Sequence, residues 1–273
     1  MTLSLTLRAN GRFLKGLSRA YVNDWQGNGA SGPEPPRRAL PSPSPPFPNS
    51  DWSYGGSPEI GVPDTNAPPL MQALYAGSNG AAWEQSRVKV YGWLAGSFNL
   101  STSHNSNYPA AYDILANRTE FDQAVLYAER LPDTVQTDHV DWGFRLSGLF
   151  GTSYRFTTNL GYFSGQLLND HRAYGFDPVL EYADLYIPQV AAGLNIRVGC
   201  FLSIPGIEAQ LAPNNYIYTH SLLYVIDPFT DTGILGTAKL NDRWLLQMGL
   251  TASHDVAPWT RPPRRGTSNV VTS

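Results

Sequence analysis

The chain has 273 residues, a formal net charge of −3, 15% charged residues and 12% aromatic residues. This balance provides no basic surface for nucleic acid, so we expect no nucleic-acid partner. A single cysteine, Cys200, excludes an intrachain disulfide and any site with several cysteine ligands. Abundant glycine and tyrosine, with few long helix-forming stretches, favour a β-rich fold.

The N-terminal residues do not resemble a complete export signal. Residues 1–13 carry Arg8 and Arg12 but lack the apolar core of about 7 to 15 residues that such a signal needs. No apolar run reaches the roughly 18 to 20 residues of a spanning helix, so a membrane-spanning form would cross with strands. We therefore expect the natural start to lie upstream of Met1.

Residues 1–28 are predicted to form an N-terminal segment with a short amphipathic helix. Apolar side chains recur near one helical face, namely Phe13, Leu14, Leu17, Tyr21 and Trp25. Packing of this helix on its own protein is the favoured interpretation, and attachment to a membrane surface is the alternative. Residues 29–86 are rich in Pro, Gly and Ser, which predicts an extended, semi-rigid extension.

Seven stretches then alternate between apolar and polar residues, as β-strands do. They lie at about 88–99, 121–130, 139–150, 180–187, 194–203, 233–240 and 244–253. The third is the clearest, because Val140, Trp142 and Phe144 share one parity while Asp141 and Arg145 share the other. An oily face opposite an ionic face, repeated at the length of a membrane-crossing strand, predicts an outer-membrane barrel.

The lengths of the connections between these stretches also alternate. Long connections at about 100–120, 151–178 and 204–231 alternate with short turns near 131–133, 188–193 and 241–242. We place residues 216–226 in the third long connection, although they could form a strand. Long loops on one side and short turns on the other are typical of an up-and-down barrel.

The polar parity supplies the candidate pore-lining residues. They are Lys89, Gln123, Glu129, His139, Asp141, Arg145, Asp184, Arg197 and Lys239. Opposed charges across a pore would create a transverse field that favours small polar solutes. The alternative is that these residues neutralise one another in pairs and fill the interior, and both interpretations can hold together.

No pattern of catalytic or cofactor-binding residues stands out. The five histidines lack paired helical spacing, so we expect no metal site. Glu129 and Asp141 could be imagined as paired acids for sugar hydrolysis, but a polar interior explains their parity equally well. No nucleophile elbow or phosphate-binding glycine loop occurs, so we expect neither an enzyme nor a cofactor.

Several motifs resemble those of a known family, the OmpL-like β-barrel porins, often called porin-2, of Gram-negative bacteria. The similar segments are Asp51-Trp-Ser-Tyr-Gly-Gly-Ser57, Asn99-Leu-Ser-Thr-Ser103, Asp122-Gln-Ala-Val-Leu-Tyr-Ala-Glu-Arg130, Asp138-His-Val-Asp-Trp-Gly-Phe-Arg145, Tyr174-Gly-Phe-Asp-Pro178, Ile207-Glu-Ala-Gln-Leu-Ala-Pro-Asn-Asn215 and His254-Asp-Val-Ala-Pro-Trp259. The resemblance runs from about residue 14 to residue 259. It implies an outer-membrane barrel that acts as a passive channel.

The resemblance also sets the expected partners, which are the lipid bilayer of the outer membrane and small polar solutes. A homo-oligomer of the full-length protein is a further possible partner arrangement, which the sequence does not decide. The alternative function is a structural or glycan-binding barrel, whose loop residues would engage an envelope component. They are Tyr108, Tyr112, Tyr154, Tyr162, Asn214, Tyr216 and Tyr218.

The predicted fold is all-β, an antiparallel up-and-down transmembrane β-barrel with about 7–8 strands, incomplete in this chain. The barrel domain is expected over residues 87–259 and a polar tail over 260–273. The tail shows no alternation and no terminal aromatic residue, unlike the family, whose members look as if they continue with more strands. We therefore expect an N-terminal fragment of a porin-like protein, which alone would aggregate and form no pores.

Overall fold

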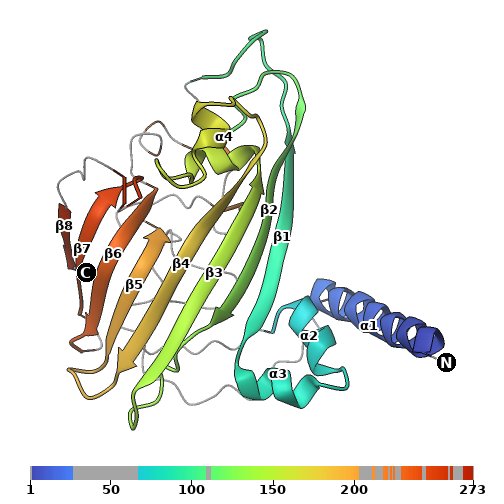
Figure 1. Cartoon of the computed structure of the whole chain (residues 1–273), viewed down its shortest axis with the longest axis vertical. Helices are drawn as coiled ribbons and strands as arrows, with labels where there is room; N and C mark the ends of the chain where they lie inside the picture. The colour runs from blue at the N-terminus through green and yellow to red at the C-terminus, as the bar shows by residue number, and fades with distance from the viewer. Residues whose placement is uncertain are drawn as a thin grey trace.

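The computed structural model shows one curved antiparallel sheet with helices at its N-terminal edge (Figure 1). It describes residues 2–26, 67–108, 112–202, 211–212, 218–220, 222, 224, 229–241, 244–257, 259–260 and 267–272. Residues 33–66, most of the predicted proline-rich extension, lie outside the described residues. No helix in the described part of the chain is long and apolar enough to cross a membrane.

The sheet contains eight strands in the order β1 to β8, each paired with its neighbour in the sequence. The strands are β1 (Lys89–Phe98), β2 (Thr119–Arg130), β3 (Asp141–Gly151), β4 (Gly175–Ile187), β5 (Leu194–Leu202), β6 (Thr230–Lys239), β7 (Leu245–His254) and β8 (Thr267–Thr272). Every pairing is antiparallel. This confirms the predicted up-and-down order.

Two strands differ from the expectation. β4 begins at Gly175, earlier than the predicted residue 180. β8 lies in the region predicted as a polar tail. It pairs with β7, with Thr267 opposite Thr251 at one end and Thr272 opposite Leu246 at the other. Alternation could not reveal β8, because the segment is short and its two valines, Val270 and Val271, are adjacent. Part of the segment expected as a polar tail is therefore a strand, and among the described residues this strand does not pair back to β1.

The sheet is not closed into a barrel. Among the described residues, β1 pairs only with β2 and β8 only with β7. An unpaired strand edge exposes a row of backbone donors and acceptors, which is costly in lipid. The arrangement is that of an incomplete barrel wall, as predicted.

The connections alternate as the sequence predicts. Residues 99–118, 152–174 and 203–229 form the long connections at one end, which we call the loop end. Residues 131–140, 188–193 and 240–244 form the short connections at the opposite, turn end. The long connection 152–174 contains a short 3-10 helix, η1 (Thr152–Phe156), and the helix α4 (Gly165–Leu168), which lies at the loop end in Figure 1.

Three further helices precede the sheet. They are α1 (Thr2–Trp25), α2 (Pro69–Tyr75) and α3 (Gly80–Ser86). α1 agrees with the predicted amphipathic helix but extends closer to the N-terminus. α2 and α3 were not predicted, because their seven-residue lengths give too little periodicity to recognise. Met71 of α2 is fully buried, and its sulfur accepts a hydrogen bond from the Val90 amide at the start of β1.

The two faces of the sheet have opposite character. On β3, Trp142, Leu146 and Phe150 are 46–55% exposed, whereas Asp141 and Arg145 are at most 5% exposed. We call the exposed apolar side the convex face and the side that carries Arg145 the concave face. Apolar outside and charged inside is the reverse of a water-soluble sheet and is the pattern of a strand that faces lipid.

Candidate pore lining on the concave face

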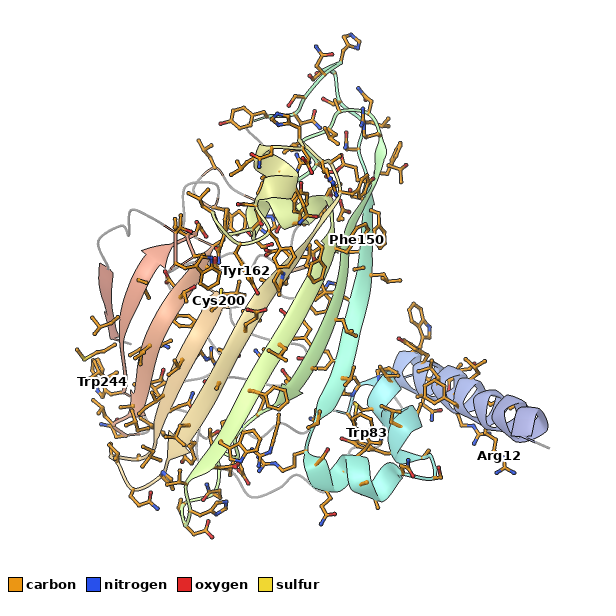
Figure 2. All side chains as sticks on the ribbon, in the orientation of Figure 1. Arg12, Trp83, Phe150, Tyr162, Cys200 and Trp244 are labelled. Atoms are coloured by element: carbon orange, nitrogen blue, oxygen red, sulfur yellow. The ribbon has the colours of Figure 1, made fainter. Side chains whose placement is uncertain are left out.

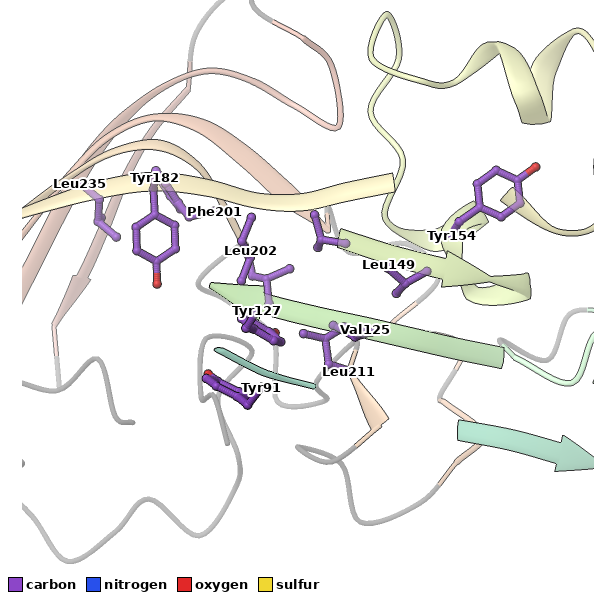
Figure 3. Close-up of a cluster of buried hydrophobic side chains, with 12 residues drawn as sticks. Tyr91, Val125, Tyr127, Leu149, Tyr154, Tyr182, Phe201, Leu202, Leu211 and Leu235 are labelled. Carbon is purple, nitrogen blue, oxygen red and sulfur yellow. The ribbon is translucent and has the colours of Figure 1, made fainter. Parts of the chain in front are cut away.

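The concave face combines buried charges with tyrosines. Figure 3 shows Tyr91, Tyr127 and Tyr182, from three strands, on this inner side of the curved sheet. Tyr91 and Tyr127 stack with their ring centroids 5.0 Å apart. They belong to an apolar cluster that also includes Leu149 and Leu235. The concave face is therefore not uniformly polar, and this apolar component was not predicted from the alternation of each strand.

Two ion pairs join neighbouring strands within this face. The Arg145 Nε donates to Glu129 Oε2 over 2.6 Å, linking β3 to β2, and both side chains are 1% exposed. The Arg197 guanidinium donates to both oxygens of Asp184 over 2.9 and 3.1 Å, linking β5 to β4. Four of the predicted lining residues are thus paired with one another in the structure.

The arginines also lie over tyrosine rings. The guanidinium carbon of Arg197, on β5, is 3.8 Å from the ring centroid of Tyr182 on β4. The guanidinium carbon of Arg145, on β3, is 5.8 Å from the same centroid. A cation held against an aromatic face gains attraction when it is removed from water. Tyr182 therefore connects the two ion pairs into one layer of the concave face.

The register explains why these residues meet. Lys89 lies opposite Glu129, Glu129 opposite Arg145, and Arg145 opposite Tyr182, so four strands contribute to one row. Residues directly opposite each other on antiparallel strands point to the same face. The sequence predicted which face each side chain is on. Which side chains lie next to one another in the row depends on the register between the strands.

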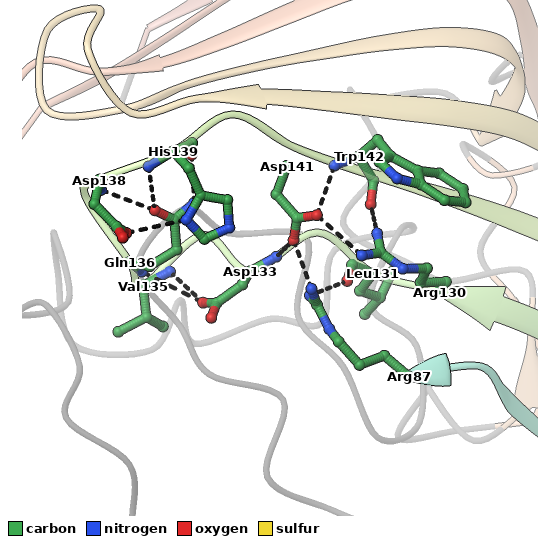
Figure 4. A network of polar contacts seen from close by, with 10 residues as sticks. All are labelled: Arg87, Arg130, Leu131, Asp133, Val135, Gln136, Asp138, His139, Asp141 and Trp142. Atoms are coloured by element: carbon green, nitrogen blue, oxygen red, sulfur yellow. Dashed lines mark hydrogen bonds and ion pairs between the residues drawn. The ribbon is translucent and has the colours of Figure 1, made fainter. Parts of the chain in front are cut away.

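Asp141 has a different environment at the turn end (Figure 4). Its oxygens accept hydrogen bonds from Arg87 at 2.8 Å, Arg130 at 3.0 Å, the Asp133 amide at 2.7 Å and the Trp142 amide at 2.9 Å. These donors come from the residue that follows α3, the end of β2, the 131–140 turn and β3 itself. Asp141 therefore fixes the turn, and the structural interpretation fits it better than pore lining.

The remaining predicted lining residues lie in three kinds of place. Lys239 and Gln123 are fully buried, and Gln123 Oε1 accepts hydrogen bonds from Trp93 Nε1 and from the amide of Ala212. Lys89 is half-buried at the start of β1. His139 lies in the turn before β3, exposed and paired with Asp138, and is not part of a strand lining.

Acidic residues near the loop end were not among the predicted set. Glu120 and Asp122 of β2 are at most 4% exposed, and Asp122 accepts hydrogen bonds from Ser97 and Thr152. The register of β1 and β2 shifts between Ala95 and Gly96, opposite this segment. Such an irregularity breaks simple alternation, which is why parity did not reveal these side chains.

One polar patch lies on the convex face. Glu181 and Cys200 are direct neighbours in the row that begins with exposed Leu146, so they face the same side as Leu146. The Tyr162 hydroxyl donates to the Glu181 carboxylate at 2.7–2.8 Å, and Asn159 Nδ2 contacts Cys200 Sγ at 3.5 Å. Figure 2 shows Tyr162 beside Cys200 near the loop end of the sheet.

We call residues 157–165 the strap, because they cover this patch. Burial and the adjacent Glu181 raise the pKa of the Tyr162 hydroxyl, which keeps the hydrogen bond donor protonated. Aromatic side chains of the strap contact exposed aromatic side chains beside it. The ring centroids of Phe163 and Phe176 are 5.8 Å apart, and those of Tyr162 and Trp259 are 5.5 Å apart. Aromatic residues at this level are typical of the girdle that flanks the apolar band of a barrel.

Two of the loop tyrosines, Tyr112 and Tyr154, are buried within the protein, whereas Tyr108 is exposed. Tyr112 is 3% exposed and stacks on Phe156 and His220 with centroid distances of 4.6 and 4.2 Å. Tyr154 is fully buried and donates to the Arg172 carbonyl. Rings in such contacts cannot stack on a sugar, which disfavours these two as a glycan platform. Asn214 and Tyr216 lie outside the described residues.

The described residues contain no group of three or more His, Cys, Asp or Glu side chains that could hold a metal ion. An antiparallel sheet with a lipid-type convex face and a charged concave face defines the class of outer-membrane β-barrels. The family model described as "Putative beta-barrel porin-2, OmpL-like" matches residues 87–268, and the chain belongs to this family. No curated protein and no solved structure shows significant similarity to the chain.

Family membership supports a porin-type barrel in an outer-membrane lipid environment. It also suggests a non-enzymatic role. The match begins at residue 87, immediately before β1, and extends into β8. The expected resemblance to OmpL-like porins is therefore confirmed for the sheet.

Proposed function

We propose that the sheet forms part of the wall of a passive diffusion channel for small hydrophilic solutes in the outer membrane. The observation that supports this proposal is that charged and apolar side chains lie on opposite faces of the sheet. The concave face carries Arg145, Glu129, Asp184 and Arg197, and the convex face carries the exposed apolar side chains. Placing charged groups inside a barrel has a desolvation cost, which water in a lumen would reduce.

The chemistry of this face suits small polar solutes. Positive and negative side chains alternate across neighbouring strands, so the potential changes sign over the width of the wall. Such a surface offers hydrogen bonds to either end of a polar molecule and little contact for an apolar one. The tyrosines between the charges add hydroxyl groups and aromatic faces.

The test is conductance of the full-length protein, folded into planar bilayers. We expect ion-conducting events from heat-resistant, folded protein, and folded protein without conductance would contradict the channel. Neutralising both arginines, Arg145→Gln with Arg197→Gln, would remove the cations that pair with Glu129 and Asp184 and make the concave face more negative. The preference should then shift toward cations.

The matched control is Asp138→Asn, which changes an exposed charge in the turn. It should leave ion preference unchanged, because a distant exposed charge is screened by salt. If the double variant conducts with the ion preference of the wild type, the ion pairs hold the wall together and do not set selectivity. That result would leave the channel itself intact.

A further inference from the structure

α1 has three different faces along its described side chains. Gly16, Ala20 and Asn23 recur at helical spacing on the face toward α2, where Ala20 is 5% exposed. A Cβ at Gly16 would lie 3.9 Å from the Cβ of Ala73, so the two helices approach closely there. α2 is the helix that covers this face, and it leaves the rest of α1 open.

Four exposed apolar side chains of α1 lie on another face, and Val22, 49% exposed, lies at the edge of the basic face. Phe13, Leu14, Tyr21 and Trp25 are 37%, 61%, 57% and 93% exposed, and at 100° per residue they fall within about a third of the helix circumference. We call these four residues the apolar stripe. The predicted packing of α1 on its own protein is therefore correct for the α2 side only. A stripe of this size exposed to water costs free energy.

Basic residues occupy the third face. Arg12, Lys15 and Arg19 are exposed and lie between the α2 side and the far edge of the stripe. In Figure 2, Arg12 projects from the side of α1 that faces the turn end. Since Arg12 is nearly opposite the centre of the apolar stripe on the helical wheel, the stripe points toward the loop end, the direction in which the apolar convex face of the sheet extends from the turn end.

The position of α1 matches the boundary of that band. α2 is fixed to the turn end of β1 through Met71 and Val90. α1 extends from α2 away from the sheet, and it lies at a level similar to Trp244 in Figure 2. Trp244 is 56% exposed, next to β7, as expected for an aromatic residue at a membrane interface.

We propose that α1 lies on the membrane leaflet at the turn end, with its apolar stripe among the acyl chains and its basic face against anionic phospholipid headgroups. Charge complementarity identifies the partner: α1 carries four basic residues and one acidic residue, Asp24. An amphipathic helix with basic flanks binds such a surface through apolar burial and electrostatic attraction. The adjoining barrel wall holds the helix at the surface, which raises its effective concentration there.

The proposal requires the outer-membrane barrel but not conduction, so a folded barrel that does not conduct would leave it unaffected. The test uses the full-length protein in vesicles of phosphatidylethanolamine with or without phosphatidylglycerol. Spin labels are placed by Leu14→Cys and Tyr21→Cys on the stripe and by Arg19→Cys on the basic face. Cys200→Ser removes the native thiol from every variant.

The readout is accessibility to oxygen, which partitions into acyl chains, against accessibility to a water-soluble nickel complex. We expect the oxygen-to-nickel ratio to be several-fold higher at residues 14 and 21 than at residue 19. Equal, water-like ratios at all three positions would overturn the proposal. Protection of the stripe from both reagents would also overturn it, because another part of the chain or a second copy would then cover the stripe.

The charge component has its own control. In vesicles with phosphatidylglycerol, the triple variant Arg12→Gln, Lys15→Gln and Arg19→Gln should lower the equilibrium constant for binding of α1 to the lipid surface by about fivefold for each charge removed. It should have little effect in vesicles of phosphatidylethanolamine alone. An equal effect in both vesicles would show that the basic face does not bind anionic headgroups, and the anionic-lipid proposal would fail.

Discussion

The concave and convex faces of the sheet handle charge in opposite ways. On the concave face, Arg145 and Arg197 are paired with carboxylates one strand away. On the convex face, the carboxylate of Glu181 accepts hydrogen bonds from the Tyr162 hydroxyl, and the strap covers it. A buried charge needs a counter-charge or hydrogen bonds. The concave face provides counter-charges, and the strap provides hydrogen bonds on the convex face.

The largest expected effect comes from breaking a concave ion pair. Glu129→Leu breaks the ion pair with Arg145 and removes this carboxylate from a buried cation, which should destabilise the barrel by about 3 to 5 kcal/mol. Denaturant unfolding in phospholipid vesicles, followed by tryptophan fluorescence, measures the loss. The double variant Glu129→Leu with Arg145→Met should recover most of it. A double variant as unstable as the single one would mean that the layer depends on these side chains in another way.

A charge moved onto the convex face should have the next largest effect. Met248→Arg or Phe144→Arg places a cation in the apolar band and should cost about 2 to 4 kcal/mol near its middle. Gln247→Arg is the matched control, one residue from Met248 and on the concave face. Alternation alone suggests that Ser147 would also tolerate an arginine. It is a poorer control, because Ser147 is buried and its hydroxyl accepts a hydrogen bond from the Leu180 amide. Equal losses at 247 and 248 in unfolding experiments would reject the assignment of the faces.

The strap gives the smallest effect of the three. Tyr162→Phe removes only the hydroxyl that donates to Glu181 and should cost about 1.5 to 3 kcal/mol, because a hydrogen bond to a charged group is lost. Glu181→Gln in the same background should reduce the loss, since a neutral amide needs less compensation than a carboxylate. If Tyr162→Phe is as stable as the wild type in the same unfolding assay, the strap does not shield the carboxylate.

The strap can also be tested by thiol chemistry. Cys200 is 8% exposed beneath it and should react slowly with a water-soluble maleimide. Asn159→Ala removes the side chain that contacts the sulfur, so the labelling rate should rise, whereas the distant Asn241→Ala should not change it. Fast labelling of the wild type would show that the strap does not cover this part of the convex face.

The sequence alone determined the order of the first seven strands, the faces of their side chains and the alternation of long and short connections. Those features are local, since a strand's two-residue period and the residues of its turns are set by the segment itself. The same reasoning placed Arg145 and Arg197 on the polar face and Phe144 on the apolar face, as the structure has them.

Only the tertiary structure decided which side chains meet. The row from Lys89 through Glu129 to Arg145 depends on the register of three strands, and the strap reaches Glu181 and Cys200 across segments distant in sequence. Glu181 had a signal in the sequence, because it shares parity with Ala183 and Leu185, but nothing local indicated that Tyr162 covers it. Local periodicity fixes the face of a side chain, whereas its partner is set by pairing and loop packing between distant segments.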